Sequence, residues 1–182
     1  MSVEKEGKWT IKNTAREIAN LAVFVALVIA AQFLFSFVAG VEIVTVLFVT
    51  YAFTFGIRRG MLAATAFSLL RMFIFGVFFN VLVLYLLYYN ALVVCFGFLG
   101  RRVKNPLKNL WWIVLVACVC TACFTLLDNI LTPLWYAYTE KATKAYFIAS
   151  LPVLFPQILC TAVTVGVLFL PLRKAFGFAK IR

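Results

Sequence analysis

Six long apolar stretches, separated by short polar or basic segments, fill almost the whole of this 182-residue chain. Crossing the hydrocarbon core of a bilayer takes about 20 apolar residues in a helix, because each residue rises ~1.5 Å and the core is ~30 Å thick. Hydrophobic residues make up 65% of the chain and charged residues 13%, a composition far outside that of soluble globular domains. The sequence therefore predicts an all-α integral membrane protein.

The stretches predict one membrane domain over residues 1–182, folded as a compact bundle of six transmembrane helices. The first stretch is itself long, follows basic residues and lacks a small-residue cleavage site, so we expect a retained helix rather than a cleaved signal peptide. The expected spans cover residues 17–36, 41–57, 60–78, 80–99, 110–136 and 147–171.

The basic residues predict how this bundle sits in the membrane. Fourteen of the 17 Lys and Arg residues fall in the N-terminal segment, the turn after the second span, the loop after the fourth and the C-terminal segment. The opposite side holds only Lys141 and Lys144, and Arg71 lies inside a span. By the positive-inside rule, both termini are expected in the cytoplasm of a multi-pass cell-membrane protein.

The formal net charge of +11 is divided among short loops instead of forming a continuous groove. Loop charges of this kind act as a topology signal, whereas nucleic-acid binding needs a basic surface that follows a phosphate backbone. We therefore expect membrane lipids with anionic headgroups, and no nucleic acid, as partners.

Catalytic chemistry has little support in the sequence, because the chain contains no histidine. Beyond the N-terminal region the only acids are Glu42, Asp128 and Glu140, so a general acid–base pair or a Ser-His-Asp relay cannot be assembled in the usual way. No phosphate-cradling loop or zinc-protease motif is present. We expect no enzyme and no catalytic residues.

A C-x-C-x-x-C cluster, made of Cys118, Cys120 and Cys123, suggests a metal site at first sight. The first two lie ~200° apart around an α-helix, so they cannot chelate one ion while the helix is intact. Without histidine or a nearby acid the zinc shell would be poor. We expect no metal and interpret these cysteines as small buried packing residues.

Charged groups inside the bilayer are the best guide to function, since each costs several kcal/mol unless it is paired or hydrated. Arg71 lies midway along the third span, Asp128 and Asn129 lie in the outer half of the fifth, and Glu42 precedes the second. Either acid could neutralise Arg71. Two interpretations stay open: a structural pair between Arg71 and Asp128, or side chains that face a ligand.

Aromatic and amide residues gather at the same expected depth. Tyr85, Tyr88 and Tyr89 share a helix face by their spacing, with Asn80 at its outer end. Trp135 and Gln157 belong to the outer parts of the last two spans. These side chains are consistent with an outer pocket for a small, flat, polar molecule, or with an ordinary aromatic belt at the membrane interface.

The first span carries alanines at four-residue spacing, Ala22, Ala26 and Ala30. Small residues let two helix backbones approach closely, either inside a bundle or against a partner protein. Because the other spans are rich in bulky Phe and Leu, we expect this stripe to face outward and dock a partner helix.

In their order along the chain, these alanines and three further motifs resemble the substrate-binding S components of energy-coupling factor (ECF) vitamin transporters. The further motifs are Gly40-Val-Glu-Ile-Val-Thr45, Phe55-Gly-Ile-Arg-Arg-Gly60 and Phe75-Gly-Val-Phe-Phe-Asn80.

The resemblance implies a subunit of a prokaryotic plasma membrane that captures a small water-soluble vitamin or precursor from outside. It would then dock through Ala22, Ala26 and Ala30 onto a transmembrane T component energised by two ATP-binding subunits. No cofactor belongs to the chain itself, since the partner subunits use the ATP. By resemblance, Glu42 lies in the segment that corresponds to the gate loop, and the pocket candidates are Tyr85, Asp128, Asn129, Trp135 and Gln157. Arg71 and Asn80 of the polar cluster complete the substrate-binding candidates.

A different class of protein also fits the alanine stripe. A non-transporting membrane scaffold or subunit could bind a permanent partner helix through it, and would need no small-molecule ligand. A membrane enzyme and a self-sufficient secondary transporter are weaker alternatives, since the chain has no catalytic constellation and no convincing internal repeat.

Overall fold

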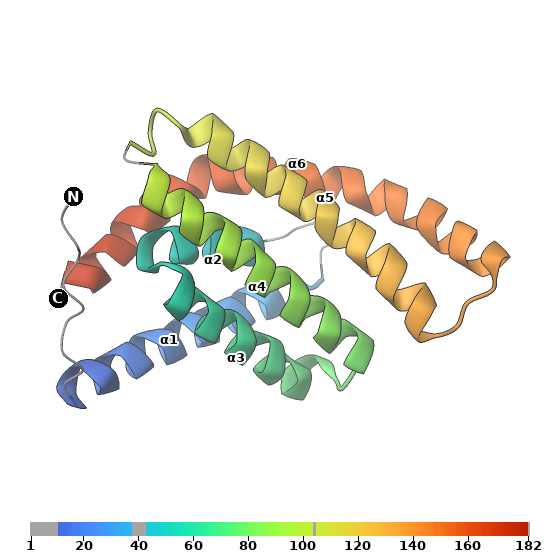
Figure 1. The fold of residues 1–182 in the computed structure, drawn as a ribbon, viewed down its shortest axis with the longest axis horizontal. Helices are drawn as coiled ribbons and strands as arrows, with labels where there is room; N and C mark the ends of the chain where they lie inside the picture. The colour runs from blue at the N-terminus through green and yellow to red at the C-terminus, as the bar shows by residue number, and fades with distance from the viewer. Residues whose placement is uncertain (1–10, 38–42, 104, 182) are drawn as a thin grey trace.

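The structure, a computed structural model, describes residues 11–37, 43–103 and 105–181, and these form α-helices without strands. Six helices follow one another along the chain (Figure 1). Their bounds are α1 Ile11–Phe35, α2 Val44–Phe55, α3 Ile57–Phe75, α4 Phe79–Arg102, α5 Leu110–Trp135 and α6 Glu140–Ile181. The prediction of an all-helical chain is confirmed for this part of the molecule.

Four of these helices contain segments long and apolar enough to cross a membrane: Ala15–Phe35, Phe79–Arg102, Leu110–Trp135 and Glu140–Phe178. This composition is compatible with a multi-pass membrane protein. α2 is apolar but has only 12 residues, which at ~1.5 Å per residue is well short of a ~30 Å core. Neither the expected second span, 41–57, nor the expected third, 60–78, is among the segments that qualify, and the six-span topology stays a prediction.

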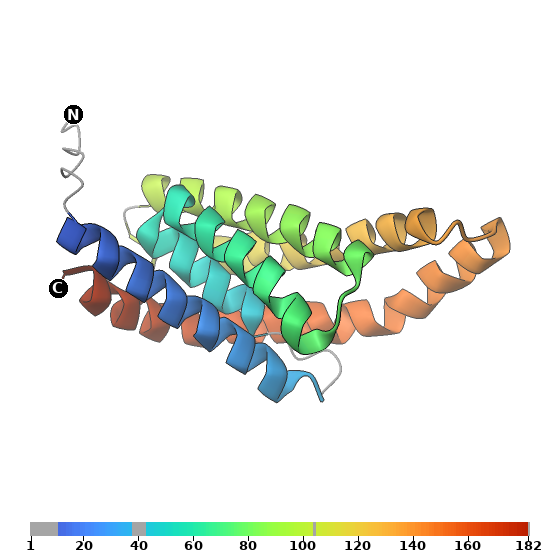
Figure 2. The same ribbon diagram turned by 90° about the horizontal axis from the view of Figure 1, so that it is seen from below.

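Successive helices run in alternating directions between the two ends of the bundle (Figure 1). The start of α1, the α2–α3 turn, the α4–α5 loop and the end of α6 lie at one end (Figures 1 and 2). We call this the basic end, because Arg58, Arg101 and Arg173 are among the cations that belong to it. The opposite end, where α5 turns into α6, is called the far end.

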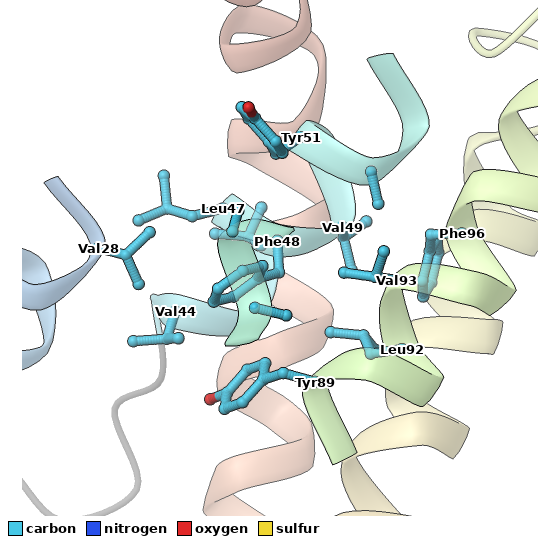
Figure 3. Packing of buried hydrophobic residues seen from close by; sticks show 14 of the residues in the cluster. Val28, Val44, Leu47, Phe48, Val49, Tyr51, Tyr89, Leu92, Val93 and Phe96 are labelled. Atoms are coloured by element: carbon cyan, nitrogen blue, oxygen red, sulfur yellow. The ribbon is translucent and has the colours of Figure 1, made fainter. Parts of the chain in front are cut away.

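α2 lies at the centre of the molecule, in contact with all five other helices. Every side chain from Val44 to Phe53 is buried. Figure 3 shows Phe48 and Val49 of α2 between Val28 of α1 on one side and Val93 of α4 on the other. A helix that is apolar all round is stable when protein or lipid surrounds it, and protein surrounds most of α2.

Aromatic rings connect α2 to its neighbours. The Phe48 ring centroid lies 5.5 Å from that of Phe24 on α1, 5.3 Å from Phe67 on α3 and 4.8 Å from Tyr89 on α4. Tilted and edge-to-face pairs at these distances add about 0.5–1.5 kcal/mol each beyond the area they bury. Phe48 is therefore the residue through which four helices share one packed centre.

The α5–α6 hairpin extends beyond the other helices at the far end (Figures 1 and 2). α6 contains Pro152, Pro156 and Pro171 within its 42 residues, and it bends in its N-terminal half (Figure 2). Proline removes a backbone N–H and crowds the preceding turn, which bends a helix. Pro152 and Pro156 both belong to the N-terminal half of α6.

Gly100 of α4 allows a close helix contact at the basic end. A Cβ atom built on it would lie 2.5 Å from the carbonyl oxygen of Phe53 in α2. This is a contact with backbone, which cannot turn aside as a flexible side chain can. A glycine is therefore required where α4 passes the last turn of α2.

We expect Gly100→Ala to lower the free energy of unfolding by about 1–3 kcal/mol, because the added methyl group forces α4 away from α2. Gly166→Ala on α6 is the matched control, since a Cβ there meets nothing within 4 Å. The control should be neutral or slightly stabilising, by up to ~1 kcal/mol, through helix propensity. Unfolding of the purified variants in detergent measures both values, and equal stability of the two would contradict the close contact.

Candidate functional site

A cavity of about 310 Å³ lies between α5 and α6. Ligand pockets in proteins typically begin at ~300 Å³, so this one matches a small molecule. Its walls combine an acid, hydroxyl groups, an amide and an aromatic ring. The lining residues are Phe124, Thr125, Asp128, Tyr146, Ala149, Ser150, Val153 and Gln157.

Asp128 is the charged group of this cavity. Thr132 Oγ1 donates a hydrogen bond of 2.7 Å to its Oδ1, and Tyr146 OH donates one of 2.7 Å to its Oδ2. Within the described part of the chain, no Lys or Arg forms an ion pair with it. The carboxylate is thus oriented by two hydroxyl groups, and its charge is left for a cation or donor group in the cavity to balance.

A series of hydrogen bonds holds α5 and α6 together around the cavity. Thr121 Oγ1 and Thr161 Oγ1 lie 3.0 Å apart, Thr125 Oγ1 donates to Gln157 Oε1 at 3.2 Å, and Asn129 Nδ2 donates to Ser150 Oγ at 2.8 Å. Sequence reasoning missed the two threonines of α5. The four-residue spacing of positions 121, 125 and 129 places all three on one helix face and could have identified them.

Arg71 belongs to a separate cluster on α1, α3 and α4. Its guanidinium carbon lies 4.1 Å from the Tyr85 ring centroid and 5.0 Å from that of Phe75. Arg71 Nε donates to Gln32 Oε1 at 3.2 Å, and Gln32 Nε2 donates to Tyr85 OH at 3.2 Å. Aromatic faces and an amide therefore stabilise this charge, and the sequence had not indicated Gln32.

The structure does not bring Arg71 and Asp128 into an ion pair among the described residues. The two groups lie on opposite sides of an aromatic contact, in which the Tyr85 ring stands 5.9 Å from that of Phe124. Tyr85 contacts Arg71, whereas Phe124 lines the cavity that holds Asp128. The structural pair that the sequence left open is therefore not the arrangement found.

The remaining predicted site residues are scattered. Asn129 supports the cavity through its bond to Ser150 without lining it. Asn80 is buried on α4, and its Oδ1 accepts a 3.4 Å hydrogen bond from Tyr136 OH. Trp135 is 53% exposed and does not line the cavity. Glu42 lies outside the described residues.

The alanine stripe lies on the outer face of α1, where Ala22, Ala26 and Ala30 are all exposed. The opposite face of the helix contributes Phe24 and Val28 to the core. The stripe is therefore not used for packing between helices of this bundle. Its small side chains would allow another helix backbone to come close at these positions.

The cysteines are less buried than the sequence suggested. Cys118 and Cys120 are half-buried and Cys123 is exposed, so the interpretation as buried packing residues is wrong for Cys123. In the part of the chain that the structure describes, no group of three or more His, Cys, Asp or Glu residues is placed to hold a metal ion.

Comparison of the chain with protein-family models, curated proteins and solved structures finds no match. The chemistry of the site must therefore be judged from its own geometry. The α5–α6 cavity joins one carboxylate with hydroxyl and amide groups and an aromatic wall. Such a lining suits a small molecule that carries hydrogen-bond donors or a positive charge.

If Arg71 and Asp128 are independent, the effects of Arg71→Gln and Asp128→Asn on the free energy of unfolding should add to within about 0.5 kcal/mol. A double-mutant cycle, measured by unfolding of the two single variants and the double variant, tests this. A coupling energy above ~1 kcal/mol would show that the two charges interact directly.

Proposed function

We propose that this chain is the substrate-binding S component of an ECF-type importer, which captures a small water-soluble vitamin or vitamin precursor. The observation that carries the proposal is the α5–α6 cavity, with its acid held by two hydroxyl groups. The exposed alanine stripe of α1 supports it independently, because it offers a docking face for the transmembrane T component. ATP hydrolysis belongs to two further subunits.

The proposed membrane arrangement has six helices and places the basic end in the cytoplasm, as the positive-inside rule requires. The cavity, nearer the far end, then faces the outside, where the substrate is captured. The short α2 is compatible with this arrangement. Because other helices enclose it, α2 does not have to match the thickness of the lipid core.

The cavity chemistry narrows the substrate class. Asp128 is the acid among the lining residues, and neither a Lys nor an Arg accompanies it there. A bound molecule with an amine, a cationic ring or several N–H groups would balance the carboxylate and replace its lost hydration. Phe124 supplies a flat apolar face against which a ring can lie.

Neutralisation of Asp128 also links binding to transport. Moving an unpaired carboxylate toward lipid costs several kcal/mol, so an empty cavity opposes tilting of the bundle. A substrate that balances the charge removes this cost. Docking through α1 is then favoured in the loaded state, which gives the importer its direction.

Two measurements test whether the α5–α6 cavity binds a ligand: whether the purified protein retains one, and how tightly it binds it. We expect the purified wild-type protein to release a stoichiometric vitamin or precursor in mass spectrometry, and Asp128→Asn to bind it about tenfold or more weakly. Glu140→Gln is the matched control, because Glu140 is an exposed acid of α6 that does not line the cavity. Release of lipids alone would overturn the proposal.

If the alanine stripe is the docking face, a change in it should affect transport but leave ligand binding intact. Ala26→Trp places a bulky ring in the middle of the stripe, so we expect it to abolish uptake and co-purification with the T component. Ligand affinity should stay within about twofold, since the change lies on the outer surface of the bundle.

Ala91→Trp, on an exposed position of α4, controls for the presence of a large residue at the surface. Loss of ligand binding in Ala26→Trp would contradict the docking role.

A permanent membrane scaffold is the second candidate, and the same exposed stripe favours it. The two functions differ in their response to ligand. A scaffold would keep its partner whether or not Asp128 is changed, whereas an S component should dock in a ligand-dependent way. Co-purification of the partner with the Asp128→Asn variant separates the two.

A further inference from the structure

A second cavity, of about 530 Å³, lies at the basic end, far along the bundle from Asp128. It is bounded by the last turns of α2 and α4, by Leu107 in the α4–α5 loop, and by α6. The function proposed above makes no use of it. Its walls are chemically different from those of the far-end cavity.

Two consecutive cations of α6, Arg173 and Lys174, provide the charge of this cavity, and none of its lining residues is acidic. The Arg173 guanidinium carbon lies 5.4 Å from the centroid of the Phe53 ring. In the described part of the chain, neither cation forms an ion pair with an acid. Arg173 is therefore positioned by an aromatic face while its hydrogen-bond donors are available to an anion.

The rest of the lining is largely apolar, since Leu107 and Leu170 stand beside Phe53. Near the same end, Trp111 and Trp112 at the start of α5 are exposed, with stacked rings 4.3 Å apart. Exposed tryptophans and basic residues together are typical of the level at which lipid headgroups meet the hydrocarbon core. The cavity thus combines charge for a headgroup with a surface for the top of an acyl chain.

We propose that this cavity binds the headgroup of an anionic phospholipid. Its phosphate lies between Arg173 and Lys174, and the glycerol and upper acyl carbons lie against Leu107 and Leu170. A soluble phosphate compound would share the charge contact but would leave the apolar wall uncovered, so the lining favours the lipid.

A lipid in this position would add a contact shared by three helices, of which α2 and α4 already approach closely at Gly100. It would contact the last turns of α2 and α4 and the C-terminal part of α6 at once. Because it would bind the folded bundle and lose this site on unfolding, it would raise the stability of the protein in proportion to its concentration.

Gly177 provides a way to close the cavity without disturbing the fold. It lines the cavity, and a Cβ atom built on it meets nothing within 4 Å. In Gly177→Leu the first added atom therefore meets open space, and the larger side chain is expected to occupy part of the cavity. Gly166→Leu is the matched control, because Gly166 lies on the same helix, is equally open and does not line the cavity.

The experiment measures thermal unfolding in mixed micelles that contain either phosphatidylglycerol or phosphatidylcholine. For the wild type and Gly166→Leu, we expect phosphatidylglycerol to raise the midpoint by about 4 °C or more relative to phosphatidylcholine. The Gly177→Leu variant should lose most of this shift. The double variant, which combines Arg173→Gln with Lys174→Gln, should lose it as well. Bound phospholipid should disappear in parallel from native mass spectra.

Three results would overturn the proposal. An equal shift in Gly177→Leu and wild type would mean that the anionic lipid acts on the basic loops in general. The same shift with glycerol 3-phosphate at equal concentration would assign the site to a soluble anion.

The double Gln variant could instead lose the same stability in both lipids. That result would mean that the two cations only offset the partial negative charge at the C-terminal ends of helices. Ligand binding at Asp128, measured on the same variants, tests the proposed S-component function separately from the lipid site, because the two cavities share no residue.

Discussion

Enclosure of α2 by the five other helices is the constraint on which the rest of the structure depends. A 12-residue apolar helix is too short to span a bilayer by itself, and it is stable here because protein covers ten of its residues, Val44 to Phe53. Phe48 shows how this works, since its ring contacts residues of α1, α3 and α4. The surrounding helices are thereby held at fixed positions, and the two ends of the bundle become the places where cavities remain.

The two cavities differ because the packing around them differs. Beyond the reach of α2, the outer part of the α5–α6 hairpin is held by hydrogen bonds between polar side chains, such as Thr125 with Gln157 and Asn129 with Ser150. Such bonds fix direction as well as distance, so they can orient groups around a small polar molecule. The basic end instead combines aliphatic and aromatic walls with cations, which suits an amphipathic ligand.

Arg71 and Asp128 inside the bundle are stabilised separately, each by its own neighbours. Arg71 lies against the rings of Tyr85 and Phe75, whereas Asp128 accepts hydrogen bonds from Thr132 and Tyr146. A buried ion pair between them would have neutralised both and left no reason for a charged ligand to bind. Because each is only partly satisfied by its neighbours, the charge of Asp128 is left for a substrate to balance under the proposed function.

The amino-acid sequence by itself determined the helical class, since only helices satisfy the backbone of such apolar stretches in a membrane. It also predicted Asp128 and Gln157 as members of one polar region, and both line the α5–α6 cavity. The spacing of Ala22, Ala26 and Ala30 put them on a single helix face, because helical spacing is a local property. Only the tertiary structure decided that α2 is short and central, that Arg71 is partnered by Gln32 and Tyr85, and that Trp135 stays outside the cavity. These outcomes depend on which helices become neighbours. Neighbour choice is set by side-chain packing over long sequence distances, such as the 39 positions between Gln32 and Arg71, and periodicity along one helix carries no information about it.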